Sequence, residues 1–388
     1  MNALLRILPL ALLAIGMFAN PQDVLTSATA GLTLWWRYVL PALLPFFILS
    51  ELLIAQGFVH FLGVMLEPLM RPLFHLPGKA SFVIVMGYTS GFPLGAVLTA
   101  RLRNQAEITR EEGQRLLAFT NNPSPGFMFG AVASGMLGQP ELGIILAGAV
   151  YLANLGVGLL FRFYHSDQNS RHPAPAPSLK KAFQEMKHAQ NLDGRPVGRI
   201  LGDSIRNSAT NVITVGGFVV FFSVIIHLLT TWHITSVLAV LIHPLTGGLL
   251  AVERIESIIN GLFEMTIGCQ GAIQTFPALS QQIGTLSFLM GWSGLSIFAQ
   301  IASFTAETDL RMGPFVFARI LHAFLALALS QLFLFVSKVP AATGLFLPPI
   351  PTTQLWLNTW RLSFLIFAGS IGCLLVLSLL YRLRAKYK

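Results

Sequence analysis

The chain has 388 residues, of which 54% are hydrophobic and only 11% are charged. A soluble domain carries about 25% charged residues, so this composition excludes a soluble enzyme and indicates a polytopic membrane protein in a lipid bilayer. Apolar stretches of about 20 residues, long enough to cross a bilayer as a helix, recur along the chain. The net charge of +9 is typical of basic cytoplasmic loops. Because no nucleic-acid-binding motif accompanies it, we expect no nucleic-acid partner.

The sequence carries no signature of catalysis or of metal binding. The two cysteines, Cys269 and Cys373, lie in apolar stretches and predict neither a disulfide framework nor a metal site. A Ser/His/Asp set, an HExxH helix and a nucleotide-binding loop are all absent from the sequence. We therefore expect no cofactor, no enzymatic activity and no ATP-driven transport by this chain.

Residues 1–30 are predicted to form an N-terminal transmembrane helix and an outer linker. The apolar stretch 3–19 resembles a signal peptide, but the small-residue pattern needed for cleavage is poor at Phe18-Ala19-Asn20. We therefore expect this helix to be retained. The linker that follows it carries no Lys or Arg, which is typical of the exterior.

Residues 31–163 form the first of two predicted halves. Its first span has tryptophans as interface anchors, and it places Glu51 near its inner end, where we expect a solvated carboxylate. The next stretch, 57–75, is interrupted by prolines and is too short to cross a membrane alone. Further along, Thr109 and Glu112 have the spacing of a capping box and predict the start of a helix.

Glycine and proline clusters interrupt two apolar stretches of this half. They lie at 87–95 (GYTSGFPLG) and 120–126 (TNNPSPG), and they predict a helical hairpin over 80–101 and a discontinuous helix over 115–136. Each backbone group freed in hydrocarbon costs several kcal/mol, so such breaks persist only inside protein or beside a polar cavity. Secondary transporters build substrate sites from broken segments of this kind, whereas a single break is also compatible with a kinked structural helix.

Two segments connect and complete the halves. Residues 164–206 are basic and contain several prolines, and we expect them to form a cytoplasmic linker with a short surface helix over 180–192. Residues 338–388 are predicted to form an outer loop, a last transmembrane helix and a basic cytoplasmic tail.

The second half, residues 207–337, repeats the first in outline. A span over 208–230 precedes a second broken hairpin over 256–277, which has the sequence EMTIGCQG at its centre. A helix over 284–305 is then interrupted at GWSGLS, and another span over 314–337 follows. The order of hairpin, discontinuous helix and unbroken span is therefore the same in both halves.

The charge distribution predicts how the two halves are oriented. If the basic linker and the tail lie inside, the first hairpin opens to the cytoplasm and the second to the exterior, as an inverted repeat requires. Lys and Arg then gather on the inner side, as the positive-inside rule favours. The exceptions are Arg37, Arg254, Arg319, Lys338 and Arg361. The predicted fold class is an all-α polytopic membrane protein with inverted repeats, two re-entrant helical hairpins and discontinuous helices.

Several motifs resemble those of the YlbJ-type sporulation integral membrane proteins of endospore-forming bacteria. In the first half they are VLPALLPFFILSELL, LEPLMRPLFHLPG, MGYTSGFPLGA and RLLAFTNNPSPGFMFGAV. In the second half they are GLFEMTIG, GWSGLSIFAQ and ARILHA. The resemblance covers essentially the whole chain and keeps the order of the motifs.

The resemblance implies a gate-type, nucleoside-recognition repeat, similar to that of concentrative nucleoside transporters. It also implies a multi-pass protein of the bacterial cell membrane, in the outer forespore membrane during sporulation, that moves dipicolinate into the developing spore. The related transporters form trimers, so the resemblance allows a homo-oligomer. Nucleoside transporters of this fold carry acidic side chains in their hairpins. The first hairpin here has none, which suits an anionic substrate better than a nucleoside.

Candidate substrate-binding residues lie at the predicted breaks, where half-helix N-termini and polar side chains supply donors for carboxylates. The candidates are Thr89, Ser90, Gly91, Asn121, Asn122, Ser124, Glu264, Thr266, Gln270, Ser293, Ser296 and Gln300. The glycines either admit a ligand close to the backbone or serve the packing of helices. Trp292 either stacks on an aromatic substrate or packs in the core.

Ionisable residues inside predicted spans are further candidates, because a charge at the bilayer centre costs at least about 2.5 kcal/mol. Arg319 either neutralises a substrate carboxylate or forms an ion pair with Glu264. His322 shares one helix face with Arg319, since the two are three residues apart. Glu264 and His322 are candidates for coupling transport to protons, with a packing histidine as the alternative for His322.

The sequence thus predicts a secondary transporter of a small organic anion, with dipicolinate as the substrate that the resemblance implies. Transport would proceed by alternating access around a midplane site between the two hairpins. A transporter of nucleosides or another small metabolite with the same fold is one alternative. The other is a membrane assembly factor for the spore envelope that transports nothing.

Overall fold

A computed structural model describes residues 2–165 and 178–337, and within these ranges the chain is helical throughout, with turns but no strands. The predicted outer loop, last span and tail at 338–388 lie outside the described residues. The helices of the first half are α1 (Asn2–Ala19), α2 (Pro21–Leu34), the π-helical turn η1 (Trp35–Val39), α3 (Leu40–Ala55), α4 (Phe58–Phe74), α5 (Ala80–Ser90), α6 (Leu94–Asn104), α7 (Arg110–Phe119), the π-helix η2 (Gly126–Met136) and α8 (Leu142–Phe161).

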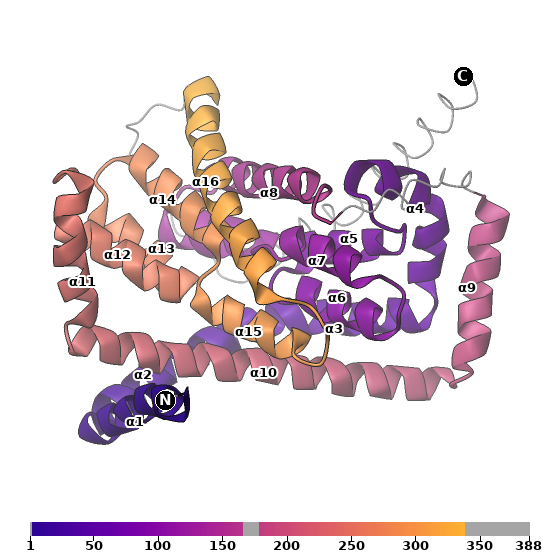
Figure 1. The fold of residues 1–388 in the computed structure, drawn as a ribbon, viewed down its shortest axis with the longest axis horizontal. Helices are drawn as coiled ribbons and strands as arrows, with labels where there is room; N and C mark the ends of the chain where they lie inside the picture. The colour runs from indigo at the N-terminus through magenta and orange to yellow at the C-terminus, as the bar shows by residue number, and fades with distance from the viewer. Residues whose placement is uncertain (1, 166–177, 338–388) are drawn as a thin grey trace.

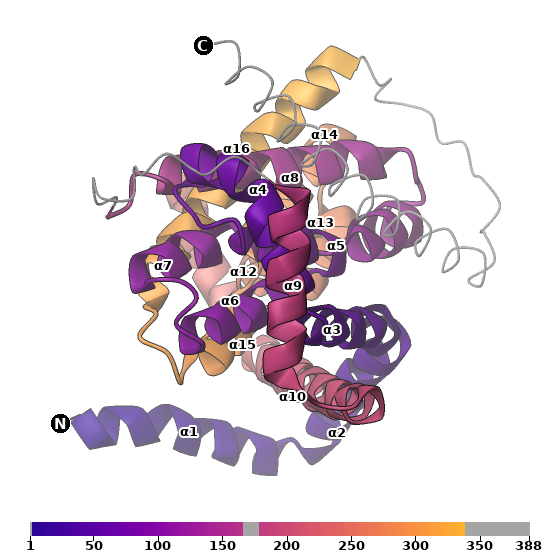
Figure 2. The same ribbon diagram turned by 90° about the vertical axis from the view of Figure 1, so that its right-hand side faces the viewer.

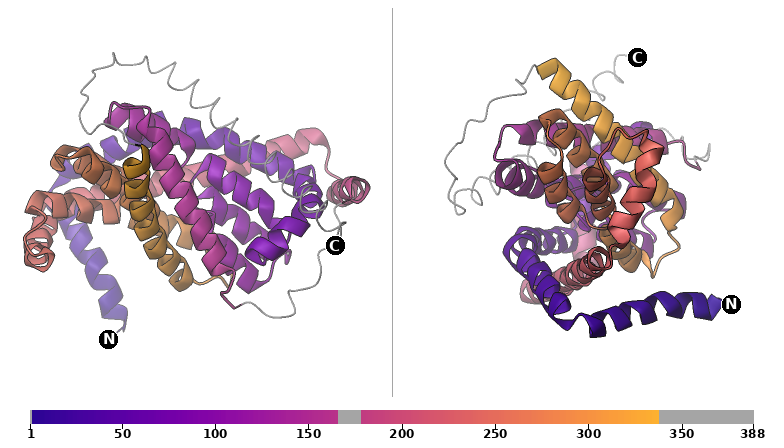
Figure 3. Two further views of the ribbon diagram at one scale, coloured as in Figure 1. Left: turned by 90° about the horizontal axis from the view of Figure 1, so that it is seen from above. Right: turned by 90° about the vertical axis from the view of Figure 1, so that its left-hand side faces the viewer.

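The remaining helices begin with the predicted surface helix, which is present as α9. They are α9 (Leu179–Asp193), α10 (Val197–Thr231), α11 (Ile234–Ile242), the 3₁₀ turn η4 (His243–Thr246), α12 (Val252–Phe263), α13 (Met265–Thr275), α14 (Leu279–Trp292), α15 (Leu295–Thr305) and α16 (Met312–Ser337). In Figure 1, α10 runs along one edge of the molecule, with α9 at one end and α11 at the other. The first helix, α1, projects from the body (Figures 2 and 3).

Several helices are long and apolar enough to cross a membrane, as the composition predicts. By length and composition, four spans lie within the described residues: Leu142–Phe161, Val197–Thr231, Leu279–Thr305 and Met312–Val336. Two further pairs qualify if each bent pair is one span. One is α1 with α2, bent by 102°, and the other is α3 with α4, bent by 82°. The protein is therefore a multi-pass membrane protein with between four and six such spans in the described part.

The four predicted helix breaks are all present. The α5–α6 pair is interrupted after Ser90, and the α12–α13 pair is interrupted at Glu264. The chain leaves helical structure between α7 and η2, and again at Ser293 and Gly294 between α14 and α15. The predicted capping box starts α7: the backbone N–H of Glu112 donates to the Thr109 hydroxyl at 3.2 Å, and the Glu112 carboxylate accepts from the Thr109 N–H at 2.9 Å.

The expectation of a solvated Glu51 was wrong. Glu51 is 9% exposed, and its carboxylate lies 2.6 Å from the guanidinium of Arg101 on α6. The span α3 is thereby tied to the first hairpin, a long-range contact that the local sequence does not reveal.

Two large apolar clusters form the core. One fills the space around α3 to α7. The other contains Phe92 between α5 and α6, Met128 on η2, Met265 at the start of α13 and Leu289 on α14. Both hairpins therefore reach the same apolar cluster, which also includes the residues on either side of the breaks.

Candidate functional site

The break between α5 and α6 packs directly on the break after α7. A Cβ added at Gly87 would lie 2.0 Å from the carbonyl oxygen of Thr120, and one at Gly95 would lie 2.1 Å from the same oxygen. Gly91 has a φ of +86°, and a Cβ there would lie 2.7 Å from the Ser124 nitrogen. These three glycines therefore leave room for the backbone of the neighbouring break. The group that approaches them closely is this backbone and not a ligand.

Asn121 links the two breaks through its side chain. Its Oδ1 accepts a hydrogen bond from the backbone N–H of Ala96, in the first turn of α6, at 2.9 Å. Its Nδ2 donates to the carbonyl of Leu117 at 3.1 Å. The Asn121 side chain is completely buried, and these two bonds engage both the oxygen and the nitrogen of its amide. Asn121 thus positions the start of α6.

Arg319, completely buried on α16, caps the broken end of α7. Its guanidinium donates to the carbonyls of Asn121 at 2.6 Å and Ala118 at 2.9 Å, and to Oδ1 of Asn154 at 2.8 Å. A cation at the C-terminal end of a helix is favoured by the carbonyl dipoles there. In the described part of the chain no carboxylate lies within 4.0 Å of Arg319, so the ion pair with Glu264 that the sequence left open is not formed.

Three residues of this network were not anticipated from the sequence. Asn154 donates to the Tyr88 hydroxyl at 3.2 Å and to the carbonyl of Phe119. Tyr151 donates to the carbonyls of Tyr88 at 2.7 Å and of Pro123 at 3.2 Å. Asn154 and Tyr151 lie on α8, which has no break. The signal that could have found Asn154 is an amide in the middle of an otherwise apolar span.

The second hairpin meets the second broken helix in a similar way. A Cβ at Gly294 would lie 3.1 Å from both the Met265 nitrogen and the Phe263 oxygen, which flank Glu264. Trp292 donates from Nε1 to the carbonyl of Leu262 at 3.0 Å, so it is anchored on the hairpin. Each hairpin break is therefore seated on the break of the discontinuous helix that follows it.

The side chains of Glu264 and His322 both form hydrogen bonds with backbone groups. Glu264 is half-buried, and its carboxylate accepts the N–H of Ile267 at 2.8 Å, capping α13. His322 is completely buried, and its Nε2 lies 2.8 Å from the carbonyl oxygen of Val150 on α8. These bonds match the packing role that the sequence left open for His322.

Several candidate side chains are buried without a protein partner. Ser90 Oγ, both polar atoms of Asn122, both polar atoms of Gln300 and Arg319 Nε find no hydrogen bond among the described residues. An unsatisfied buried polar group costs about 1–3 kcal/mol, so a group of them near two helix breaks is typical of a binding site. Phe298 and Ile301, which flank Gln300 on α15, pack with Ala96 and Leu117 beside the first break.

The other candidates differ in their hydrogen bonds and in their burial. The Thr89 hydroxyl donates to the Val85 carbonyl at 2.9 Å in its own helix, and Ser124 accepts the Phe127 N–H at 3.2 Å, capping η2. Ser293 and Ser296 are buried, and Thr266 is half-buried. Gln270 is exposed.

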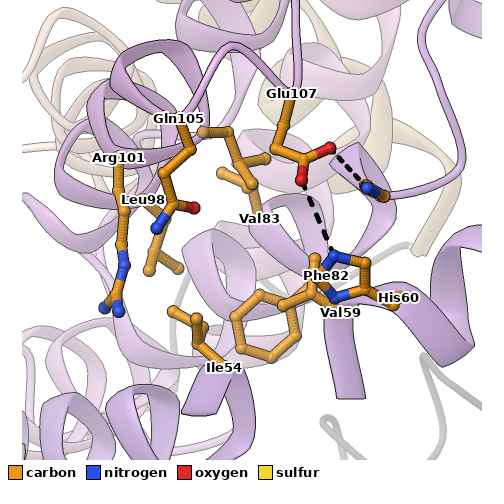
Figure 4. Close-up of a pocket in the computed structure, with 11 residues that line it drawn as sticks. Ile54, Val59, His60, Phe82, Val83, Leu98, Arg101, Gln105 and Glu107 are labelled. Carbon is orange, nitrogen blue, oxygen red and sulfur yellow. Dashed lines mark hydrogen bonds and ion pairs between the residues drawn. The ribbon is translucent and has the colours of Figure 1, made fainter. Parts of the chain in front are cut away.

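A pocket lies at the far end of the first hairpin from the break (Figure 4). Its apolar wall includes Phe82 and Val83, and at its rim Glu107 pairs with Lys79 and lies 3.6 Å from His60 Nε2. None of the candidate site residues lines it. The described residues also contain no group of three or more His, Cys, Asp or Glu side chains able to hold a metal ion.

The chain has several apolar spans, two pairs of helix breaks that pack against each other, and buried polar groups near these breaks. These features define a class: the multi-pass integral membrane proteins with polar groups in their interior. Residues 36–140, which include the first hairpin and the first break, match the family model described as "Gate: Nucleoside recognition". The chain is 44% identical over 315 residues to the sporulation integral membrane protein YlbJ of Bacillus subtilis (strain 168), covering 79% of this chain and 76% of that protein. It therefore belongs to the YlbJ family of sporulation integral membrane proteins.

A second relative is matched over a shorter region. The chain is 27% identical over 140 residues to the uncharacterized protein BpOF4_10220 of Alkalihalophilus pseudofirmus, which covers 35% of this chain and 29% of that protein. No solved structure matches the chain.

Proposed function

We propose that this protein is a secondary transporter of a small organic anion, with dipicolinate as its substrate, in the outer forespore membrane. One observation supports this above the others: Ser90, Asn122, Gln300 and the Nε of Arg319 are buried donors without protein partners, near breaks of membrane-embedded helices. Breaks of this kind are where secondary transporters bind their substrates. The sporulation family of the chain favours a substrate of spore formation.

The chemistry of these groups suits a carboxylate. Amide, hydroxyl and guanidinium N–H or O–H groups donate to carboxylate oxygens. Arg319 supplies positive charge even though three of its bonds are made to the protein. Glu264, which caps the second hairpin, is the proposed proton carrier, because a proton taken up with the substrate offsets part of its negative charge.

Alternating access would use the two halves as inverted repeats. Each half has a hairpin, a discontinuous helix seated against it and an unbroken span, α8 or α16. In the proposed cycle the hairpins are re-entrant and open towards opposite sides, so that the site faces one side at a time. In this cycle each hairpin would separate from its discontinuous helix at the close contact made by Gly91 in the first half or by Gly294 in the second half.

The test is uptake of labelled dipicolinate by purified full-length protein in liposomes. We expect uptake above that of empty vesicles, and a loss of about tenfold or more for Gln300→Ala, because a buried group that meets a polar ligand is worth about 1–3 kcal/mol. Gln281→Ala is the matched control, since it removes the same amide from an exposed position of the second half that is not a candidate for the site. Flux equal to that of empty vesicles, with several organic anions tried, would overturn the proposal and favour an assembly factor.

A nucleoside is the second candidate substrate. The match of residues 36–140 to a nucleoside-recognition model favours it, and paired amides such as Asn122 and Gln300 also suit a base and a ribose. Competition decides between the two. Uridine would block uptake if the site takes nucleosides, whereas aromatic dicarboxylates would block it if the site takes dipicolinate.

A further inference from the structure

The chain turns sharply where α9 meets α10, and this region, residues 179–206, is here named the α9–α10 elbow. The 35 residues of α10 span about 52 Å at 1.5 Å per residue, whereas the hydrocarbon core of a bilayer is about 30 Å thick. The first turns of α10 are its polar part, with the sequence VGRILGDSIRN. They therefore extend beyond the hydrocarbon. In Figure 1, α9 lies across this end of α10.

The exposed charges of the elbow are all positive. The exposed basic residues are Lys180, Lys181, Lys187, Arg199 and Arg206. Two of its three acidic residues are paired with one arginine, since Arg195 lies 2.5 Å from Asp193 and 2.7 Å from Asp203. The third, Glu185, is half-buried. The basic residues of the elbow therefore outnumber its acidic ones, and they are the more exposed of the two kinds.

The elbow also has an exposed apolar stripe. Val197, Leu201 and Ile205 follow one another at intervals of four residues, so they share one side of α10, and they are 73%, 45% and 46% exposed. Arg199 and Arg206, seven residues apart, lie on the other side of the helix. An amphipathic segment with basic residues on one side and apolar residues on the other is suited to the interface of a membrane.

The elbow is held firmly to the rest of the protein. Ala182 is completely buried, and the ring of Phe183 lies 5.2 Å from that of Phe61 on α4. Gln190 donates to the carbonyl of Gln56 at 3.0 Å. The basic residues are therefore presented from a fixed position and do not hang on a flexible tether.

We infer that the α9–α10 elbow lies in the headgroup layer of the inner leaflet and binds anionic phospholipid, with Lys and Arg on the phosphates and the Ile205 end of the apolar stripe towards the acyl boundary. The continuity of the elbow with a membrane span argues for lipid over a soluble acidic partner, because the span fixes its depth. Anionic lipids attract basic residues at this depth. This inference does not depend on transport.

The test uses the full-length protein in nanodiscs made from equal parts of phosphatidylcholine and phosphatidylglycerol. The phosphatidylglycerol that stays bound after extraction is measured by mass spectrometry. We expect wild-type protein to be enriched in this lipid, less so at high salt, and each of Arg199→Gln and Arg206→Gln to weaken the binding about fivefold. Arg311→Gln is the matched control, because Arg311 is an exposed arginine outside the elbow.

Three results would overturn the inference. Equal enrichment in wild type and in the Arg199→Gln/Arg206→Gln double variant would show that the elbow does not select the lipid. An equal loss in Arg311→Gln would show that net charge alone acts. Binding of inorganic phosphate with the same arginine dependence, and without preference between the two lipids, would indicate a free-phosphate site. Unchanged elution on size exclusion and unchanged helical circular dichroism would show that the variants are folded.

Discussion

Arg319 shows how a single residue connects the two halves of the protein. It belongs to α16 of the second half, yet its guanidinium bonds the Ala118 carbonyl at the end of α7, the Asn121 carbonyl in the break that follows, and the side chain of Asn154 on α8, all in the first half. The rigid planar fork of an arginine spreads five N–H donors over separated acceptors, whereas the three donors of a lysine lie on one compact ammonium group. Arg319 therefore supplies hydrogen bonds that α7 would have made had it continued as a helix.

Replacing Arg319 should destabilise the fold before it affects a ligand. Arg319→Met leaves the three acceptors buried and unpaired, and we expect a loss of about 3–5 kcal/mol in the free energy of unfolding, because each unpaired buried acceptor costs about 1–3 kcal/mol. Arg319→Lys keeps the charge but loses the fork, so an intermediate loss is expected. Thermal unfolding in detergent measures both, with Arg311→Met as the exposed control. A wild-type stability for Arg319→Met would contradict the capping role.

At the scale of helices, the breaks were predictable because their cause is local. Glycine and proline act on their own backbone, so GYTSGFPLG and TNNPSPG mark their breaks without knowledge of the partner. The partners of Arg319 and Glu51 were not predictable. Each depends on a residue far along the chain, such as Asn154 or Arg101. The exposure of Gln270 has the same origin, because the sequence does not reveal which face of α13 is covered.

One ion pair joins a helix to a loop across the two halves. Arg103 on α6 makes two hydrogen bonds of 2.9 Å with Asp309, in the loop between α15 and α16. The hydrogen bonds from Arg103 hold the pKa of Asp309 below its usual value. A carboxylate with a lowered pKa contributes its stability above the ordinary value of about 3.9 and loses it as the pH falls through the folded value.

The Arg103–Asp309 pair should contribute little to the free energy of unfolding, and only above acidic pH. The Asp309 side chain is 46% exposed, so solvent screening limits the contribution to about 0.5 kcal/mol. We expect Asp309→Asn to lower the stability by that amount at neutral pH, and the difference from wild type to vanish as the pH falls through the lowered pKa of Asp309. Thermal unfolding over this pH range measures the effect. A difference that persists undiminished in acid would mean that the pair acts through something other than charge.

The whole molecule is held together by contacts between its halves. In Figure 1, α16 crosses α8 and α14. His322 lies 2.8 Å from the Val150 carbonyl of α8, and Gln331 donates to the Ser280 carbonyl of α14 at 3.0 Å. The last described helix thus packs on an unbroken span of the first half and on a broken one of its own half. Such a shared scaffold suits two hairpins that work against a common centre.

Whether the halves are inverted in the membrane is tested by labelling from one side. Gln105, at the end of the first hairpin, and Gln281, just after the second, are both exposed and serve as single-cysteine sites once Cys269 and Cys373 are replaced by serine. Opposite orientation of the hairpins predicts that a membrane-impermeant maleimide labels Gln281→Cys on intact cells. Gln105→Cys should be labelled only after permeabilisation, because the basic elbow and the first hairpin then share the inner side. Equal labelling of both positions on intact cells would place the two hairpins on the same side, and the alternating-access cycle would lose its structural basis.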